Sequence, residues 1–214
     1  MLEFYPIVTG PLGENCYLVW KDSNAWIIDP GTDAEDIIAE LENRHLTPVA
    51  IVLTHGHFDH LGALDALLKQ WPELPVVMRE EDAEWAFTHN FNQYPPFYMH
   101  QKRPATLVAA GETYTCGGLT ARLLHTPGHT PGGQCIWFER EDGVSLCFTG
   151  DTLFKASIGR TDLPGGSFLK LNASLKMLAE TLPPETTILP GHEEASTMAW
   201  EVKHNPYLRE EEAF

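Results

Sequence analysis

The sequence predicts an α/β fold: a four-layer αββα sandwich of two mixed β-sheets packed face to face, with helices on the outer faces. Strand-like segments are followed by helix-like segments in each half of the chain, a pattern typical of layered folds. The unbroken apolar run at 49–53 has the length of a strand that is covered on both faces. With 214 residues and 43% hydrophobic side chains, the chain is large enough to bury such a core as a single domain over 1–214.

The first half of the chain opens with a predicted meander, because short alternating segments are separated by turns rich in Gly, Pro, Asp and Asn. Its strands span 2–9, 15–20 and 25–29. Ile37, Ile38 and Leu41 recur at helical spacing and predict a helix over 33–45. The elements expected after the strand at 49–53 are a helix over 59–71, a strand at 75–78, a helix over 80–89 and an irregular aromatic loop over 91–104.

The second half begins with strands that form two predicted hairpins, with turns at 117–118 and 141–143. Their strands span 112–116, 119–124, 133–138 and 144–148. The last expected elements are a helix over 167–182, a strand at 186–189 and a helix over 193–205.

Charge and cysteine content narrow the classes of function. The chain carries 14 Lys plus Arg against 30 Asp plus Glu, a formal charge of −16, which disfavours nucleic acid and anionic membrane surfaces as partners. It has no apolar run of the roughly 18 residues that a membrane span needs, and residues 1–6 do not resemble a signal peptide. The four cysteines form no Cys-x-x-Cys pair and are expected to be free thiols. We therefore expect a cytoplasmic protein.

Three imidazoles and one carboxylate follow the apolar strand within six residues: His55, His57, Asp59 and His60. A shuffled chain of this composition would contain the pattern roughly once in a thousand, so chance is a poor explanation. Imidazole and carboxylate are ligands that zinc and iron prefer, and a strand-to-helix turn can aim two of these side chains at one point and two at a neighbouring point. Two adjacent metal ions are therefore a better hypothesis than one. The alternative interpretation is a polar turn whose histidines cap a helix.

Three later segments repeat one local arrangement, in which an apolar strand and a small residue precede a metal-binding side chain. The side chains are His129, Asp151 and His192. Together with the first four they make seven candidate ligands. Two tetrahedral or five-coordinate ions that share a bridging carboxylate and a bridging water would need about this number.

The His-x-His-x-Asp-His motif at 55–60, with the later His129, Asp151 and His192, resembles the metallo-β-lactamase superfamily over nearly the whole chain. The resemblance implies the αββα sandwich, with the metals at one edge. It implies that His55, His57 and His129 bind one ion, that Asp59, His60 and His192 bind the other, and that Asp151 bridges them. An Asp at the bridging position argues against the true β-lactamases, many of which have Cys there.

Within that superfamily, three segments resemble the glyoxalase II group, the hydroxyacylglutathione hydrolases, and in particular its short bacterial members without the C-terminal helical domain. They are Gly-Asp-Thr-Leu-Phe at 150–154, Gly-Arg-Thr-Asp at 159–162 and Pro-Gly-His-Glu at 190–193. This resemblance implies a metal-dependent thioester hydrolase that converts S-D-lactoylglutathione to D-lactate and glutathione, a step of methylglyoxal detoxification. It implies that Arg160 and Phe154 contact the substrate, whereas Glu194 stands where that group often has Tyr.

The expected mechanism is attack of a metal-bridging hydroxide on the thioester carbonyl. Two cations would lower the pKa of a shared water from about 15.7 toward neutrality. Asp59 and Asp151 are the expected catalytic carboxylates, with Asp59 orienting the hydroxide. A thiolate leaves readily because the pKa of its thiol is about 8.5, so the reaction needs little help from a general acid.

Several alternatives remain open at this stage. A persulfide dioxygenase would act on glutathione persulfide with a single iron held by His55, His129 and Asp151. The third hypothesis is a binding module without catalytic activity. Zinc is the first choice of metal, with iron or manganese as alternatives, because all three accept nitrogen and oxygen ligands. The substrate is expected to be a small thioester, and the chain a monomer or small homo-oligomer.

Overall fold

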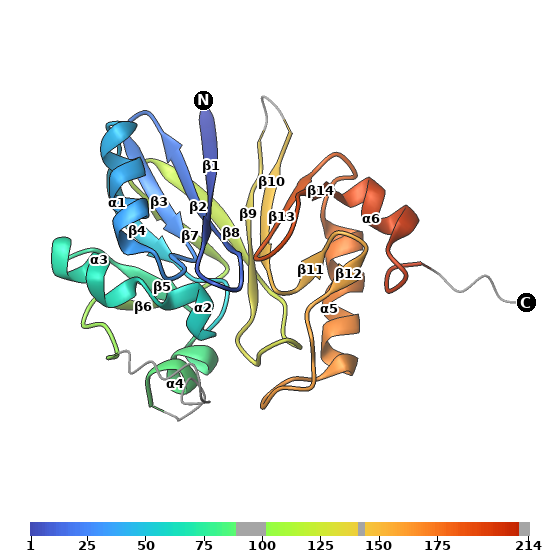
Figure 1. The fold of residues 1–214 in the computed structure, drawn as a ribbon. Coiled ribbons are helices and arrows are strands. Elements are labelled where there is room, and N and C mark those ends of the chain that lie inside the picture. Colours follow the sequence, from blue (N-terminus) through green and yellow to red (C-terminus); the bar gives the residue numbers. More distant parts are fainter. Residues whose placement is uncertain (89–101, 141–143, 210–214) are drawn as a thin grey trace, which may run out of the picture.

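The computed structural model describes residues 1–88, 102–140 and 144–209 and confirms the predicted class of fold. Two mixed six-stranded sheets pack face to face, with helices on the outer face of each sheet (Figure 1). Helices α1 and α3 cover the first sheet, and α5 and α6 lie outside the second. The helices span Ala34–Asn43 (α1), Phe58–Leu61 (α2), Leu64–Gln70 (α3), Glu80–Thr88 (α4), Phe168–Thr181 (α5) and Met198–His204 (α6).

The first sheet has the strand order β1-β2-β3-β4-β5-β6. Its first three strands are antiparallel neighbours, and β3 to β6 run parallel. Because parallel strands need crossover connections, the chain alternates between strand and helix over this half of the sheet. The strands span Leu2–Thr9 (β1), Glu14–Lys21 (β2), Asn24–Ile28 (β3), Thr47–Val52 (β4), Val76–Met78 (β5) and Leu107–Ala109 (β6).

The second sheet has the strand order β14-β13-β10-β9-β8-β7. The two predicted hairpins are present as antiparallel pairs, β7 with β8 and β9 with β10, and β13 adds in parallel to β10. The strands span Thr113–Cys116 (β7), Leu119–His125 (β8), Gln134–Phe138 (β9), Leu146–Gly150 (β10), Thr187–Pro190 (β13) and Ser196–Thr197 (β14), and a separate small hairpin pairs Leu153–Phe154 (β11) with Ser157–Ile158 (β12).

Alternation along β3 and β4 explains the unbroken apolar runs. Trp26 and Ile28 point into the core between the two sheets, whereas Ala25 and Ile27 point into the core beneath the outer helices. Residues of β4 divide in the same way, so both faces of these strands are buried. The central strands are therefore fixed from both sides, and their carboxyl ends present the following loops at a defined position.

The predicted helix over 59–71 is wrong as a single element, because it is split into α2 and α3. The backbone of Gly31 causes the interruption: its N–H donates to the carbonyl of His60 at 3.2 Å, and its carbonyl accepts from the N–H of Ala63 at 2.6 Å. These two bonds replace bonds that a continuous helix would make. The split lets α2 present Asp59 and His60 independently of the helix that follows.

The predicted helix over 193–205 begins later than expected, at Met198. Glu193 has a φ of +67°, which ends any helix there, and Ser196–Thr197 pairs with β13 as strand β14. The side chain of Thr197 then accepts from the N–H of Trp200 and caps α6. The strands β6, β11, β12 and β14 were not predicted. The expected aromatic loop at 91–104 lies mostly outside the described residues, as does the turn at 141–143.

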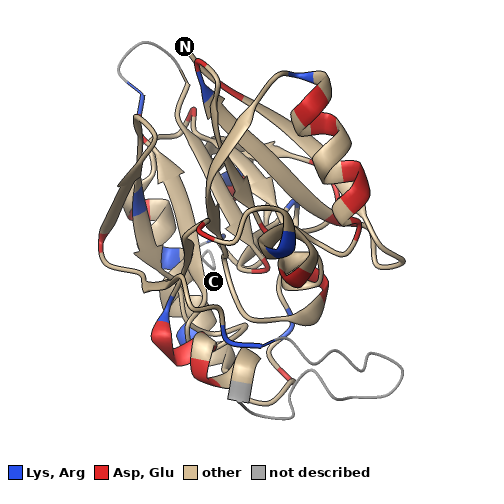
Figure 2. Ribbon diagram, turned by 90° about the vertical axis from the view of Figure 1, so that its left-hand side faces the viewer, with Lys and Arg blue, Asp and Glu red and all other residues tan. Residues whose placement is uncertain are grey.

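Acidic residues are prominent on helices α1 and α4, as Figure 2 shows for the face that carries them. This distribution accords with the formal charge of −16. Among the described residues, none of the helices combines the length and the apolar composition required to span a membrane.

Candidate metal centre

All seven candidate ligands lie where strands of the two sheets end at one edge. His55 and His57 follow β4, and Asp59 and His60 belong to α2, which begins directly after them. The other three ligands follow β8, β10 and β13 of the second sheet, and they are His129, Asp151 and His192. Both sheets therefore contribute side chains to a single edge of the sandwich.

One group of ligand atoms, here called the first cluster, comprises His55, His57, His129 and Asp151. Nδ1 of His57 lies 3.0 Å from Nε2 of His55 and 2.8 Å from Nε2 of His129. Around a tetrahedral zinc ion with Zn–N bonds of about 2.05 Å, neighbouring nitrogens are about 3.3 Å apart. The three imidazoles are thus spaced much as ligands of a single ion would be.

A second group of ligand atoms, here called the second cluster, comprises Asp59, His60 and His192. Oδ2 of Asp59 lies 3.3 Å from Nε2 of His192 and 3.9 Å from Nε2 of His60. Asp151 joins the two clusters: its Oδ2 lies 3.3 Å from Nε2 of His129, and its Oδ1 lies 3.3 Å from Nε2 of His60. The two oxygens of one carboxylate therefore face different clusters.

The residues present fit two divalent cations. Nε2 of His60 and Oδ1 of Asp151 are buried and make no hydrogen bond to any described residue, although buried polar atoms nearly always have a partner. A cation between them would satisfy both atoms. Gly191 keeps this space open, because a Cβ at that position would lie 2.5 Å from Cε1 of His60 and 2.6 Å from Oδ1 of Asp151.

The outward nitrogens of four ligand histidines are held by hydrogen bonds. Nδ1 of His55 lies 3.0 Å from Oγ1 of Thr54, and Nδ1 of His60 lies 3.0 Å from Oδ2 of Asp29. Nδ1 of His129 and of His192 donate to backbone carbonyls, those of Arg160 at 2.7 Å and Leu12 at 3.2 Å. Such bonds fix the tautomer and the ring orientation, so that Nε2 is left to face the cluster.

Burial and neighbouring charges have opposite effects on the pKa values of several candidate ligands. Burial lowers the pKa of His55 well below its usual value and lowers the pKa of His57 to about 3. Burial acts in the same direction on His60, but the nearby carboxylates of Asp151 and Asp59 outweigh it and raise its pKa. Burial raises the pKa of Asp151, but His60 and His129 more than offset this, so its pKa lies well below the usual range. In the first cluster, His55 and His57 are therefore neutral imidazoles and Asp151 is an ionised carboxylate, which are the forms that bind metals.

Three carboxyl groups that contact the candidate ligands or their loops escaped the sequence-based prediction: Glu14, Asp29 and Asp82. Asp29 accepts from the N–H and the hydroxyl of Thr54 as well as from His60. Oε1 of Glu14 lies 3.7 Å from Nδ1 of His60. Asp82 accepts from two glycine N–H groups in ligand-bearing loops. Only Asp29 had a usable signal, because like the later ligands it follows an apolar strand and adjoins small, turn-forming residues, in its case Pro30 and Gly31.

The two residues expected to contact substrate lie at the rim. The ring of Phe154 packs edge-on against that of His192, with 6.1 Å between centroids. The guanidinium of Arg160 is largely exposed and binds both oxygens of Asp162 at 2.7 Å, while its backbone carbonyl accepts from His129.

Two mixed sheets with adjoining groups of metal-ligating side chains at one edge place the chain among the metallo-hydrolases. Residues 9–192 match the family model described as the metallo-beta-lactamase superfamily, and the chain belongs to that superfamily. The resemblance stated from the sequence is thereby confirmed. Members of this superfamily bind divalent metals, and the clusters found here suit a site for two.

Two relatives with similar sequences cover nearly the whole chain. Hydroxyacylglutathione hydrolase GloC of Haemophilus influenzae is 34% identical over 97% of this chain and 97% of its own length. The probable metallo-hydrolase YqgX of Bacillus subtilis is 34% identical over 93% of this chain and 94% of its own length. Both names support a metal-dependent hydrolase.

Similar solved structures differ in the names that they carry. BLEG-1, named a B3 metallo-beta-lactamase, superposes with a TM-score of 0.87 at 37% identity and covers 97% of this chain and 100% of its own. TTHA1623 in a di-iron-bound form gives 0.83 at 37% identity, with 95% and 100% covered. ETHE1 from Myxococcus xanthus gives 0.76 at 26% identity, with 95% and 83% covered. These structures share the fold, and their names leave the substrate and the metal open.

Proposed function

We propose that the protein is a dimetal hydrolase of small thioesters, with S-D-lactoylglutathione as its first candidate substrate. One observation carries the proposal above the others: the two oxygens of Asp151 face two separate clusters of ligands at 3.3 Å each. A carboxylate so placed suits a bridging ligand between two cations. The 34% identity to a hydroxyacylglutathione hydrolase supports the choice of substrate.

In this proposal each candidate ligand keeps the role that the resemblance to the metallo-β-lactamase superfamily implies. His55, His57 and His129 would hold one ion, Asp59, His60 and His192 would hold the other, and Asp151 would contribute to both. Two bound cations would supply an activated water at neutral pH and polarise the substrate carbonyl. Zinc is the first choice, while the di-iron form of TTHA1623 keeps iron in consideration.

The protein's own groups prepare the site for this chemistry. Oδ2 of Asp59 lies near Nε2 of both His60 and His192 in the second cluster. From this position the carboxylate can accept a proton from the attacking water. The Thr54 hydroxyl, Asp29 and two backbone carbonyls hold the histidine rings, so little reorganisation is needed during the reaction. A thiolate leaving group needs no strong acid, because the pKa of its thiol is about 8.5.

The substrate would enter at the rim formed by Phe154 and Arg160. Phe154 lies against His192 and would contact the apolar part of the substrate. Arg160 would attract a carboxylate of a glutathione-derived thioester, in competition with Asp162. We also propose a cytoplasmic location. It is supported by the four cysteines, all of which are free thiols, although Cys116 is only half-buried.

A persulfide dioxygenase is the second candidate function. The Gly-Arg-Thr-Asp segment at 159–162 and the structural likeness to ETHE1 favour it. It would require one iron, held by His55, His129 and Asp151. The second cluster argues for the hydrolase, because a single iron leaves Asp59, His60 and His192 without a role.

Metal analysis with three assays tests the proposal. We expect two metal ions per chain and thiol release from S-D-lactoylglutathione under argon. One iron per chain with oxygen uptake on glutathione persulfide would establish the dioxygenase instead. Hydrolysis of a chromogenic β-lactam without thioesterase activity would transfer the function named for BLEG-1 to this chain.

A further inference from the structure

A buried carboxylate in the first turn of α4 binds two separate backbone segments. Asp82 is only 1% exposed. Its Oδ2 accepts from the N–H of Gly56 at 2.9 Å, and its Oδ1 accepts from the N–H of Gly132 at 2.5 Å. A carboxylate withdrawn from water is tolerated only when such bonds replace its hydration.

Both glycines belong to loops that carry ligands of the first cluster. Gly56 stands between His55 and His57, and Gly132 follows His129 by three residues. The first loop continues from β4 and the second from β8, so the loops come from different sheets. Asp82 therefore ties together the two loops whose imidazoles approach to 2.8 Å, between Nδ1 of His57 and Nε2 of His129.

The contact requires glycine at position 132 and favours glycine at position 56. A Cβ on Gly132 would lie 2.7 Å from the backbone nitrogen and 2.7 Å from Oδ1 of Asp82. A Cβ on Gly56 would lie 3.2 Å from the Asp82 carbonyl and 3.2 Å from Cβ of Ala86. Without side chains, both N–H groups can approach the carboxylate directly.

The second cluster is held by a different carboxylate. Asp29 binds Nδ1 of His60 at 3.0 Å and the Thr54 backbone N–H at 2.7 Å. Thr54 stands two residues before Gly56 in the loop after β4, so Asp29 also contacts one of the two loops that Asp82 joins, but it makes its direct bond to a ligand at His60. Asp82 thus joins the two ligand-bearing loops of the first cluster to each other, whereas Asp29 bonds directly to an imidazole of the second cluster.

We propose that Asp82 is a positioning residue that holds the loops of His55, His57 and His129 together and thereby sets the metal affinity of the first cluster. The second cluster does not depend on it. This inference rests on the proposed metal centre but not on the proposed substrate. It assigns a role in metal binding to a residue of α4 whose carboxylate, among the described residues, bonds to the backbone of the ligand-bearing loops and not to the side chain of a candidate ligand.

The test is a metal titration of Asp82→Asn. The amide keeps one oxygen as an acceptor, but its NH₂ group is a donor. It would face a backbone N–H, which is also a donor, so one of the two loop contacts is lost. We expect the first cluster to bind Zn²⁺ about 10- to 100-fold more weakly in chelator competition, with the second cluster unchanged. Glu81→Gln, an exposed neighbour in the same turn, should bind both ions as the wild type does.

Cobalt substitution shows which half is affected. Imidazole N–H signals of Co²⁺-loaded protein, shifted by the paramagnetic ion, should number three from the first cluster and two from the second. In Asp82→Asn, the three signals of the first cluster should appear only at a higher Co²⁺ concentration than in the wild type. Equal weakening of both clusters, or wild-type affinity at both, would overturn the proposal. Failure of the wild type to bind two ions would overturn the proposed function instead.

A second measurement applies even if Asp82→Asn fails to fold. In metal-free wild-type protein, the N–H groups of Gly56 and Gly132 should be protected from hydrogen exchange, because the carboxylate holds them before any ion binds. Exchange at the rate of exposed loop amides would contradict the proposal.

Discussion

Asp29 and His60 lie 31 residues apart in the sequence and meet at a buried hydrogen bond, with 3.0 Å between Oδ2 and Nδ1. Asp29 also accepts from the N–H of Thr54 at 2.7 Å and from its hydroxyl at 2.5 Å. Since Thr54 Oγ1 lies 3.0 Å from Nδ1 of His55, one carboxylate influences the orientation of imidazoles in both clusters. Its bond to His60 is direct, and its influence on His55 passes through a hydroxyl.

Replacing Asp29 with Asn should therefore weaken metal binding most at the second cluster. We expect an affinity loss of about 10- to 100-fold there, because His60 loses the acceptor that orients its ring. The free energy of unfolding of the metal-free protein should fall by about 1–3 kcal/mol, since a buried hydrogen-bond network is broken. Chelator competition and urea unfolding measure the two effects. Asp36→Asn, on the exposed side of α1, should change neither quantity.

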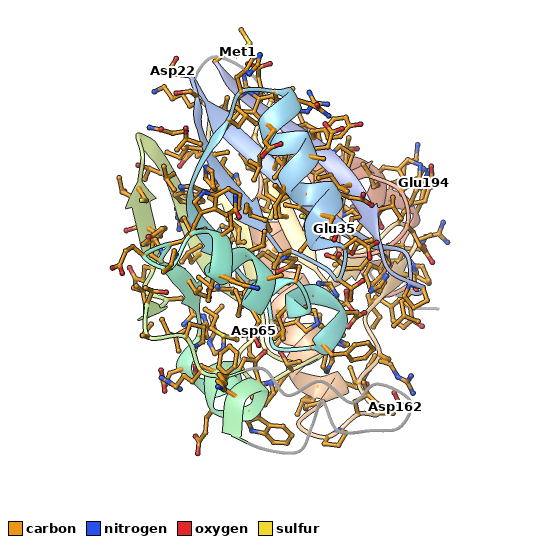
Figure 3. The ribbon with its side chains drawn as sticks, turned by 60° about the vertical axis from the view of Figure 1, so that its left-hand side comes forward. Met1, Asp22, Glu35, Asp65, Asp162 and Glu194 are labelled. Atoms are coloured by element: carbon orange, nitrogen blue, oxygen red, sulfur yellow. The ribbon has the colours of Figure 1, made fainter. Side chains whose placement is uncertain are left out.

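Asp151→Ala should abolish metal binding and hydrolysis together. Both clusters lose a ligand at once, because Oδ1 faces His60 and Oδ2 faces His129. The strand β10 before it is anchored in the core, so circular dichroism should show most of the fold retained. Asp65→Ala is a suitable control, because Asp65 is exposed and lies on the outer surface of α3 (Figure 3). Hydrolysis by Asp151→Ala with two bound metals would disprove the bridging role.

Long elements with a strong pattern were predictable from the sequence. The helix α1 and the strands β1 and β4 follow from apolar periodicity, because both helix faces and sheet faces must match a core. The unpredicted strands β6 and β14 have three and two residues and are too short to show a period. The break between α2 and α3 depends on the backbone of Gly31, which is distant in sequence.

That the seven candidate ligands lie close together was also predictable, because they combine a dense motif with a repeated strand-end arrangement. The supporting carboxyl groups were not. Asp82 is one acidic residue in the run Glu80-Glu81-Asp82, and nothing in that run distinguishes a buried acceptor from an exposed charge. Its role arises only when the two sheets bring Gly56 and Gly132 together.

Gly191→Ala should impair the centre through steric contact alone. The added methyl group would meet Cε1 of His60 at 2.5 Å and Oδ1 of Asp151 at 2.6 Å, where no flexible chain end can move aside. We expect metal content below two ions per chain and a fall in kcat of at least about tenfold. Gly111→Ala has room for its Cβ, with a nearest contact of 3.9 Å, and should keep wild-type metal content and activity.

The free energy of unfolding should depend on pH in a way that reflects the lowered pKa of the buried His57 imidazole. Its pKa falls from an ordinary 6.5 to about 3 on folding, so the unfolded chain binds one more proton between these values. Stability from this group is therefore present above pH 6.5 and is lost as the pH falls toward 3, by up to about 1.4 kcal/mol per pH unit. Urea unfolding of metal-free His57→Asn from pH 6 to pH 4 should show a slope shallower by that amount.

A control separates this effect from general acid destabilisation. His45→Asn changes an exposed histidine and should keep the wild-type slope. The raised pKa of His60 has the opposite sign, with stability present below pH 6.5 and lost at higher pH, but that residue remains in every variant compared. Identical slopes for His57→Asn and wild type would contradict the assignment.

Arg160 and Asp162 should have opposite effects on the binding of an anionic thioester. Each is largely exposed, and Asp162 lies on the outer surface in Figure 3. Removing the carboxylate in Asp162→Asn frees the guanidinium, so KM for S-D-lactoylglutathione should fall, by up to about fivefold for an exposed ion pair. Arg160→Ala should raise KM by a similar factor. Its kcat should be unchanged, because His129 contacts only the backbone carbonyl of residue 160. A thioester without carboxylates should show no change in either variant, and a change there would mean that the pair acts on the centre itself.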